Sequence, residues 1–402
     1  MLRPVAEAWS DGGARSWRPI LSGASASLVG TGLARFAYTP LIPALVAAHW
    51  FTAPAAAYLG AANLAGYLAG ALLGRPMAAR FSAIGLLRAM MLLATATFFA
   101  CSIPLGFAWF FLWRLMSGLA GGVLMVLAAP SVLPHIAPGR RGFAGGAIFT
   151  GIGLGIAASG TLVPILLRAG LAWTWLGLGA LALALTAGAW SGWPKEVVLL
   201  PDREARPAGC GPAAALPALY LEYGLNAVGL VPPMLFLADF VARGLGRGIA
   251  TGADAWTVFG LGALAGPVIA GAAADRIGFG RALRLAFLIE TVAVACLAAP
   301  IGLAPLLAAV SMVGAVMTGI VPLVFGRIHD LAAGTQRRHA AWRTATIAFA
   351  LGQAAAAYGY SALFARTGSY VLLFALGALA LLIALGCEML IAASAARLGE
   401  RG

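Results

Sequence analysis

Twelve apolar runs, each about long enough to cross a lipid bilayer, occupy most of this 402-residue chain. A backbone at bilayer depth must satisfy its own hydrogen bonds, and about 20 apolar residues of helix cross the hydrocarbon core. With 62% hydrophobic and only 10% charged residues, the chain is too apolar for a water-soluble fold. The runs therefore predict an all-α integral membrane protein. The twelve expected transmembrane helices cover 19–45, 55–74, 82–104, 107–130, 142–167, 171–193, 214–238, 255–274, 283–302, 303–326, 342–364 and 369–393.

One long polar interval, residues 194–213, separates the first six helices from the last six. Two sets of six helices with both ends on one side are typical of parallel repeats packed around a cavity near the middle of the membrane. The sequence therefore predicts two six-helix bundles joined by a linker. The expected parts are a tail at 1–18, a bundle at 19–193, the linker at 194–213, a bundle at 214–393 and a tail at 394–402.

The positive side chains indicate the orientation of these helices. Of the 26 Lys and Arg residues, twenty fall on the side of the termini, four fall on the other side, and Arg35 and Arg114 fall within helices. Insertion places loops rich in Lys and Arg in the cytoplasm. Both termini are therefore predicted to be cytoplasmic.

The same distribution argues against several other classes of protein. A net charge of +13 would suggest nucleic-acid binding in a soluble domain, but here the basic residues are spread over many loops with no basic stripe. The chain has no phosphate-binding loop of the ATPase type, and its four histidines are scattered at helix ends. We therefore expect no enzyme, no metal, no cofactor and no nucleic-acid partner.

Small residues recur at intervals of four inside several predicted helices, a spacing that lets helix backbones approach closely. Most of this pattern indicates helix packing, including the run GIGLG at 151–155, which has no preceding strand and so does not indicate a dinucleotide site. The residues concerned are Gly66, Gly70 and Gly74; Ala147, Gly151, Gly155 and Ser159; and Gly262 and Gly266.

Several segments resemble the major facilitator superfamily. GAAADRIGFGR at 271–281 is similar to the superfamily's loop motif between helices 8 and 9, and WRLMSG at 113–118 is similar to its helix 4 motif. GLARFAYTPLIPAL at 32–45 resembles the YbfB/YjiJ group of bacterial facilitators. The first-half copy of the loop motif, GRPMAARF at 74–81, lacks the acidic residue.

The resemblance implies a secondary transporter that works by alternating access. It implies that the helix 8 to 9 segment acts as a gate in which Asp275 latches onto a helix N-terminus. The gating residues carried over from the motif are Gly271, Asp275, Arg276, Gly278 and Arg281.

Charged side chains inside the predicted helices need a partner or a water-filled cavity, because a charge at mid-bilayer costs roughly 2.5–3.5 kcal/mol. Arg35 lies on one helical face with Tyr38 and either lines the cavity or forms a structural ion pair, for example with Glu222. Glu222 either carries a coupling proton or reaches cytoplasmic water. Arg114 resembles an arginine near the superfamily's proton pathway, or else it bonds to carbonyl groups of the first or second helix.

Further polar residues accompany these charges. Tyr223 and Asn226 lie near Glu222, and Gln353 adds a polar group to the eleventh helix, whereas Glu290 and Glu388 are expected to have packing or interfacial roles. We therefore predict a secondary active transporter of a small organic solute, anionic or zwitterionic, coupled to protons. The expected setting is a monomer in the bacterial inner membrane. The alternative is a polytopic membrane sensor that binds without transport.

Overall fold

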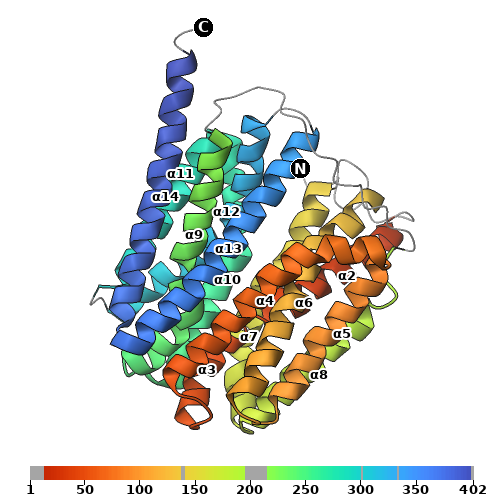
Figure 1. Cartoon of the computed structure of the whole chain (residues 1–402), viewed down its shortest axis with the longest axis vertical. Coiled ribbons are helices and arrows are strands. Elements are labelled where there is room, and N and C mark those ends of the chain that lie inside the picture. Colours follow the sequence, from red (N-terminus) through yellow and green to blue (C-terminus); the bar gives the residue numbers. More distant parts are fainter. Residues whose placement is uncertain (1–12, 137–140, 195–214, 300–301, 333–334, 400–402) are drawn as a thin grey trace.

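The computed structural model describes residues 13–136, 141–194, 215–299, 302–332 and 335–399, and within these ranges the chain is helical and contains no strand. Figure 1 shows two bundles of helices, one from each half of the chain. The predicted linker and the outermost parts of both tails fall largely outside the described residues. The helices are α2 (Gly13–Ser27), η2 (Leu28–Leu33), α3 (Tyr38–Ala47), α4 (Ala53–Arg80), α5 (Ala83–Cys101), α6 (Phe107–Val132), η3 (Leu133–His135), α7 (Arg141–Leu167), α8 (Leu171–Ala189), α9 (Ala215–Asp239), η5 (Phe240–Gly244), α10 (Gly248–Ile277), α11 (Phe279–Leu297), α12 (Leu303–Leu331), α13 (Thr335–Thr367) and α14 (Tyr370–Gly399).

Ten of the predicted spans form helices that are long and apolar enough to cross a membrane in the described part of the chain. The ninth span, α11, is not among these ten, because its 19 residues contain three charged side chains, Arg281, Arg284 and Glu290. The first span is not the single helix predicted at 19–45. It consists of α2, the π-helix η2, a turn at 34–37 and then α3.

The break in the first span has a sequence explanation. Pro40 lies in the first turn of α3, where the missing N–H of proline is not needed by the helix. Gly30 and Gly32 lie in η2, where a side chain on either would run into α6 or α7. Single π-turns of this kind are frequent at functional sites. The predicted span was right in position and wrong in continuity.

The corner between the eighth and ninth spans is tighter than predicted. The helix α10 continues to Ile277 and α11 begins at Phe279, so Gly278 alone connects them. Gly278 has φ of 82°, a left-handed conformation that glycine adopts at no steric cost. The predicted boundaries at 274 and 283 were therefore wrong, because the motif that was expected to form a loop is mostly helical.

The small-residue pattern packs helices within each half, as predicted. A Cβ on Gly66 or Gly70 would collide with the backbone of α6, and one on Gly262 or Gly266 with the backbone of α12. Gly151 and Gly155 lie in the same way against α2 and η2. These glycines are required for close approach of backbones rather than for nucleotide binding.

The two halves meet most extensively through α4 with α13, α7 with α10, and α3 with α9, and α3 also touches α10 and α4 touches α9. The contact of α3 with α9 lies toward the far end of the bundle, which we define as the end opposite to where α2 begins and α14 ends. There Thr39 Oγ1 donates a hydrogen bond of 2.8 Å to the carbonyl oxygen of Met234. Over the described residues, α6 and α12 make no comparably extensive contact across the halves. At the far end, the halves are therefore held together by α3 and α9.

Candidate solute site at the break in the first span

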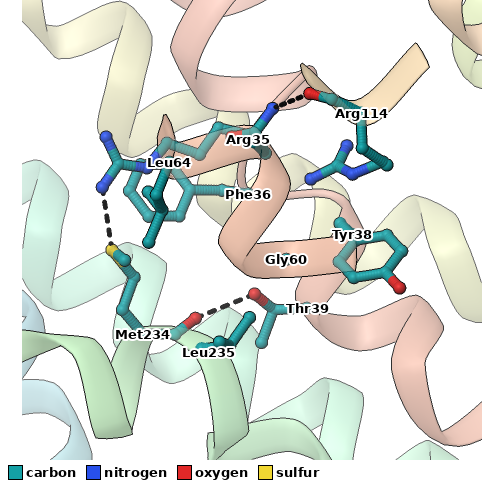
Figure 2. A pocket seen from close by; sticks show the side chains of 10 residues that line it. Arg35, Phe36, Tyr38, Thr39, Gly60, Leu64, Arg114, Met234 and Leu235 are labelled. Atoms are coloured by element: carbon teal, nitrogen blue, oxygen red, sulfur yellow. Dashed lines mark hydrogen bonds between the residues drawn. The ribbon is translucent and has the colours of Figure 1, made fainter. Parts of the chain in front are cut away.

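Arg35 occupies the break in the first span, close to where the halves meet. Its Nη2 donates to Met234 Sδ of α9 at 3.1 Å, and its guanidinium carbon lies 5.0 Å from the ring centroids of both Phe36 and Tyr67. The Nε atom is buried and has no hydrogen-bond partner. Figure 2 shows the guanidinium reaching toward Met234. Arg35 thus has aromatic and sulfur neighbours but no carboxylate partner among the described residues.

Gln353 of α13 approaches the same sulfur from the second half of the chain. Its Nε2 donates to Met234 Sδ at 3.5 Å, while its Oε1 is buried without a partner. The structure therefore brings together Arg35 and Gln353, two residues that the sequence identified separately. Together they offer a cationic donor and an amide acceptor that the protein itself leaves unsatisfied.

Arg114 and Tyr38 form hydrogen bonds to the backbone of the first and second spans, next to the break that holds Arg35. Arg114 Nη1 donates to the carbonyl oxygen of Ala34 at 2.8 Å, and Ser117 Oγ donates to the same oxygen at 2.9 Å. The guanidinium of Arg114 lies 4.2 Å from the ring centroid of Tyr38, whose hydroxyl donates to the carbonyl of Ala56 at 2.8 Å. Of the two alternatives for Arg114, the structure shows the bond to a carbonyl of the first span.

Glu222 lies apart from Arg35, and the ion pair considered between them does not form. Glu222 is fully buried in α9, and neither carboxyl oxygen has a hydrogen-bond partner. The alternative in which Glu222 reaches cytoplasmic water is therefore wrong for this conformation. An unpartnered buried carboxyl group is stabilised when it carries a proton.

Two further carboxyl groups are buried in the same bundle. Asn226 Nδ2 donates to Glu290 Oε2 at 2.7 Å, and Arg327 Nη2 lies 3.0 Å from Glu388 Oε1. Glu290 and Glu388 are both fully buried, so neither has the interfacial position considered for it. Tyr223, by contrast, packs against the aromatic rings of Trp342 and Phe349 in α13.

The gating residues lie at the corner between α10 and α11. Asp275, Arg276, Gly278 and Arg281 are exposed, and Gly271 has open space around it. Among the described residues, Asp275 makes no hydrogen bond or ion pair. The expected latch of Asp275 onto a helix N-terminus is therefore not formed in this conformation.

Two residues of the site had no place in the sequence analysis. Met234 is the acceptor shared by Arg35 and Gln353, and Tyr67 provides a ring beside the guanidinium. A signal for Met234 existed in the Pro232–Pro233 pair, which interrupts the hydrogen bonding of α9 directly before it. Tyr67 carried no such signal, because its position depends on how α4 packs.

Comparisons with known proteins agree with this architecture. The family described as "Uncharacterised MFS-type transporter YbfB" matches residues 27–389. The fold is similar to a solved structure described as "Crystal structure of D-xylose-proton symporter", with a TM-score of 0.67 over 92% of this chain and 97% of that chain. At 14% identity this likeness concerns the fold alone. No curated protein matches the chain.

Proposed function

Because the chain belongs to the major facilitator superfamily, in the family of YbfB-type transporters, we propose that it moves a small organic anion or zwitterion across the membrane together with protons. The observation that carries the proposal is the guanidinium of Arg35 at the junction of the halves, which has a free Nε atom and no carboxylate partner among the described residues. A charge in such a place is costly unless a ligand or partner compensates it. A carboxylate fits the planar edge of a guanidinium through two parallel hydrogen bonds.

The groups around Arg35 restrict the class of solute that would fit the site. Gln353 Oε1 is an acceptor without a donor, so a solute that carries an amine or hydroxyl group beside its carboxylate would satisfy both free groups. The neighbouring rings of Phe36 and Tyr67 favour a compact apolar body. Hydroxy acids and amino acids of small size are therefore the first solutes to examine.

Binding is tested by thermal shift of the purified protein against carboxylates and amino acids, each paired with the uncharged amide of the same skeleton. A ligand that binds the folded state raises its apparent stability. We expect stabilisation by acids but not by their amides, and about tenfold weaker binding in Arg35→Lys because the planar fork is lost. Arg88→Lys is the matched control, since Arg88 also lies over a ring, that of Trp190, away from the site. Equal shifts with acids and amides would contradict the anion site.

Coupling to protons is proposed to reside in Glu222, on the strength of its complete burial and its two unpartnered oxygens. The test is solute-driven acidification or alkalinisation inside reconstituted vesicles, followed with an internal pH indicator. We expect Glu222→Gln to abolish the pH change while solute exchange across the membrane persists. Binding without any flux in the unaltered protein would favour a sensor over a transporter.

The end of the bundle at which α2 begins and α14 ends, which we call the terminal end, is proposed to face the cytoplasm of a bacterial cell. The protein is proposed to work as a monomer. The distribution of Lys and Arg supports this orientation. Topology reporters fused after Gly402 and within the linker at 194–213 are both expected to indicate a cytoplasmic location. Periplasmic activity at either position would contradict the proposed topology.

The corner at Gly278 is proposed to be the gate at that end. Asp275 is exposed and unpaired in the described structure, so its latch would form only when the terminal ends of the halves approach each other. Such a contact with a helix N-terminus is worth about 0.3–2 kcal/mol. Asp275→Asn is expected to preserve expression and solute binding and to slow exchange. Unchanged exchange rates in vesicles would show that the motif has no gating role here.

A further inference from the structure

Met234 of α9 connects the solute site with the junction between the halves. Its sulfur accepts hydrogen bonds from Arg35 Nη2 at 3.1 Å and from Gln353 Nε2 at 3.5 Å, and its carbonyl oxygen accepts one from Thr39 Oγ1 at 2.8 Å. Figure 2 shows the bonds from Arg35 and Thr39 reaching the two ends of this residue. Met234 is only 4% exposed. One residue of the second half therefore makes two polar contacts with the first half.

The sulfur of Met234 is a poor partner for the groups that donate to it. A thioether is a weak acceptor. Within the described residues it is nevertheless the acceptor for the side chains of both Arg35 and Gln353, of which the first is a cation. A carboxylate oxygen in the same place would accept charge-assisted hydrogen bonds, which are roughly twice as strong as neutral ones. Replacement of the sulfur by a solute carboxylate is therefore favourable.

The edge of the guanidinium that a carboxylate would use is partly occupied. A carboxylate binds arginine through two parallel N–H groups, and Nε and Nη2 are neighbours along one edge of Arg35. Nε is buried without a partner, whereas Nη2 is bonded to Met234. The cavity beside them holds about 10 Å³ open to water, which is space for about one water molecule and not for an organic solute. A carboxylate can therefore reach this edge only after the methionine side chain has moved.

We propose that the side chain of Met234 takes the place of the solute carboxylate in the empty site, and that the solute displaces it. This inference rests on the proposed function, the transport of an organic anion. Methionine has three rotatable side-chain bonds and adapts easily to a new position. Its displacement removes one of the two contacts with the first half and leaves the bond from Thr39. Solute binding thus weakens the far-end junction of α3 with α9, which has to open for transport.

Formate tests the displacement, because it carries the carboxylate and nothing else of a solute. Met234→Ala removes the competing sulfur and leaves room beside Arg35. We expect formate to raise the apparent melting temperature of Met234→Ala at about tenfold lower concentration than that of the unaltered protein, since the hydrogen bond that it must replace is gone. Formamide at the same ionic strength should have no such effect. Equal midpoints of the formate titration in the two proteins would overturn the proposal, and so would the absence of any response in Met234→Ala.

Two further variants show where the formate acts. Met91→Ala is the matched control, because Met91 is a buried methionine of α5 whose sulfur takes part in no hydrogen bond within the described chain. It should respond to formate as the unaltered protein does. Arg35→Gln combined with Met234→Ala should abolish the response. A response that persists in this double variant would overturn the competition between carboxylate and sulfur for Arg35.

If Met234→Ala fails to fold, Met234→Leu provides the test, since leucine conserves the volume of methionine without an acceptor. We expect Met234→Leu to lower the apparent melting temperature when Arg35 is present and to have little effect in Arg35→Gln, because the contact that it removes is absent there. Formate should restore the loss in Met234→Leu, and formamide should not. Additive losses from the two substitutions would overturn the role of the sulfur.

The proposed function and the displacement fail in different measurements. Organic acids that stabilise the unaltered protein no more than their amides do would contradict the anion site, and the absence of flux would contradict transport. The formate titrations compare variants with one another and do not depend on which solute the protein carries. A site that binds acids but shows the same formate midpoint with and without the sulfur would retain the proposed function and overturn the displacement.

Discussion

At the scale of single residues, the site combines groups that the protein satisfies with groups that it leaves free. Arg35 and Arg114 both have aromatic neighbours and a buried Nε atom without a partner, but Arg114 also donates to a carbonyl oxygen, whereas Arg35 donates to the thioether sulfur of Met234. The difference arises because Arg114 points at the carbonyl groups exposed by the break in the first span. An arginine bonded to a backbone carbonyl supports structure, and one whose acceptor is a thioether, a weak acceptor, is the better candidate for a ligand.

Substitutions of Tyr38 distinguish a structural role from a role in solute binding. Tyr38→Phe removes the hydrogen bond to Ala56 but keeps the ring beside Arg114, so we expect a loss of about 0.5–1.5 kcal/mol in the free energy of unfolding and unchanged solute affinity. Tyr38→Leu should lose about 0.5–2 kcal/mol more, because the cation–π contact is also lost. Denaturation in detergent checks both values, with Tyr58→Phe as control. A solute affinity that falls in Tyr38→Phe would place the hydroxyl in the binding site.

At the scale of elements, glycine decides how closely the helices approach. A Cβ on Gly118 of α6 would overlap the carbonyl group of Asn63 in α4, and Gly122 lies in the same way against Tyr67. Because these contacts involve backbone atoms, they cannot be relieved by rotation of a side chain. The position of Tyr67 beside Arg35 therefore depends on Gly118 and Gly122.

Gly118→Ala is expected to destabilise the protein by about 1–3 kcal/mol and to weaken solute binding, because α4 and α6 must separate to admit the methyl group. Gly188→Ala in α8 is the matched control, since its Cβ meets open space and alanine is the better helix former by about 1 kcal/mol. Thermal unfolding of the two variants in one detergent compares them directly. Equal stability would mean that α4 and α6 pack less tightly than the structure shows.

At the scale of the whole molecule, the halves are joined at the far end by α3 and α9. Thr39 bonds to Met234, and a Cβ on Gly60 would meet the side chain of Leu235, so the far halves of the first, second and seventh spans pack together. Alternating access requires this contact to open.

A disulfide between Gly60→Cys and Leu235→Cys is expected to hold the far end closed. The new side chain at position 60 fits because the leucine that would obstruct it has been shortened. Oxidation should stop transport and reduction should restore it, while each single cysteine variant should be insensitive to both. Transport that continues in the fully cross-linked protein would show that this end does not open.

The sequence alone determined the helical class, the number of spans, the division into halves and the corner motif, because hydrophobic length and glycine placement are local properties of the chain. It also identified Arg35, Arg114, Glu222 and Gln353 as notable, since an ionisable or polar group inside a span is conspicuous by itself. Only the tertiary structure decided which of them meet. Arg35 joins Gln353 through Met234, and Asn226 joins Glu290, because partners are set by the packing of helices far apart in the chain. The break in the first span has a signal in Pro40, but where it falls also depends on the close approach of Gly30 to α6 and of Gly32 to α7, which only the packed helices show.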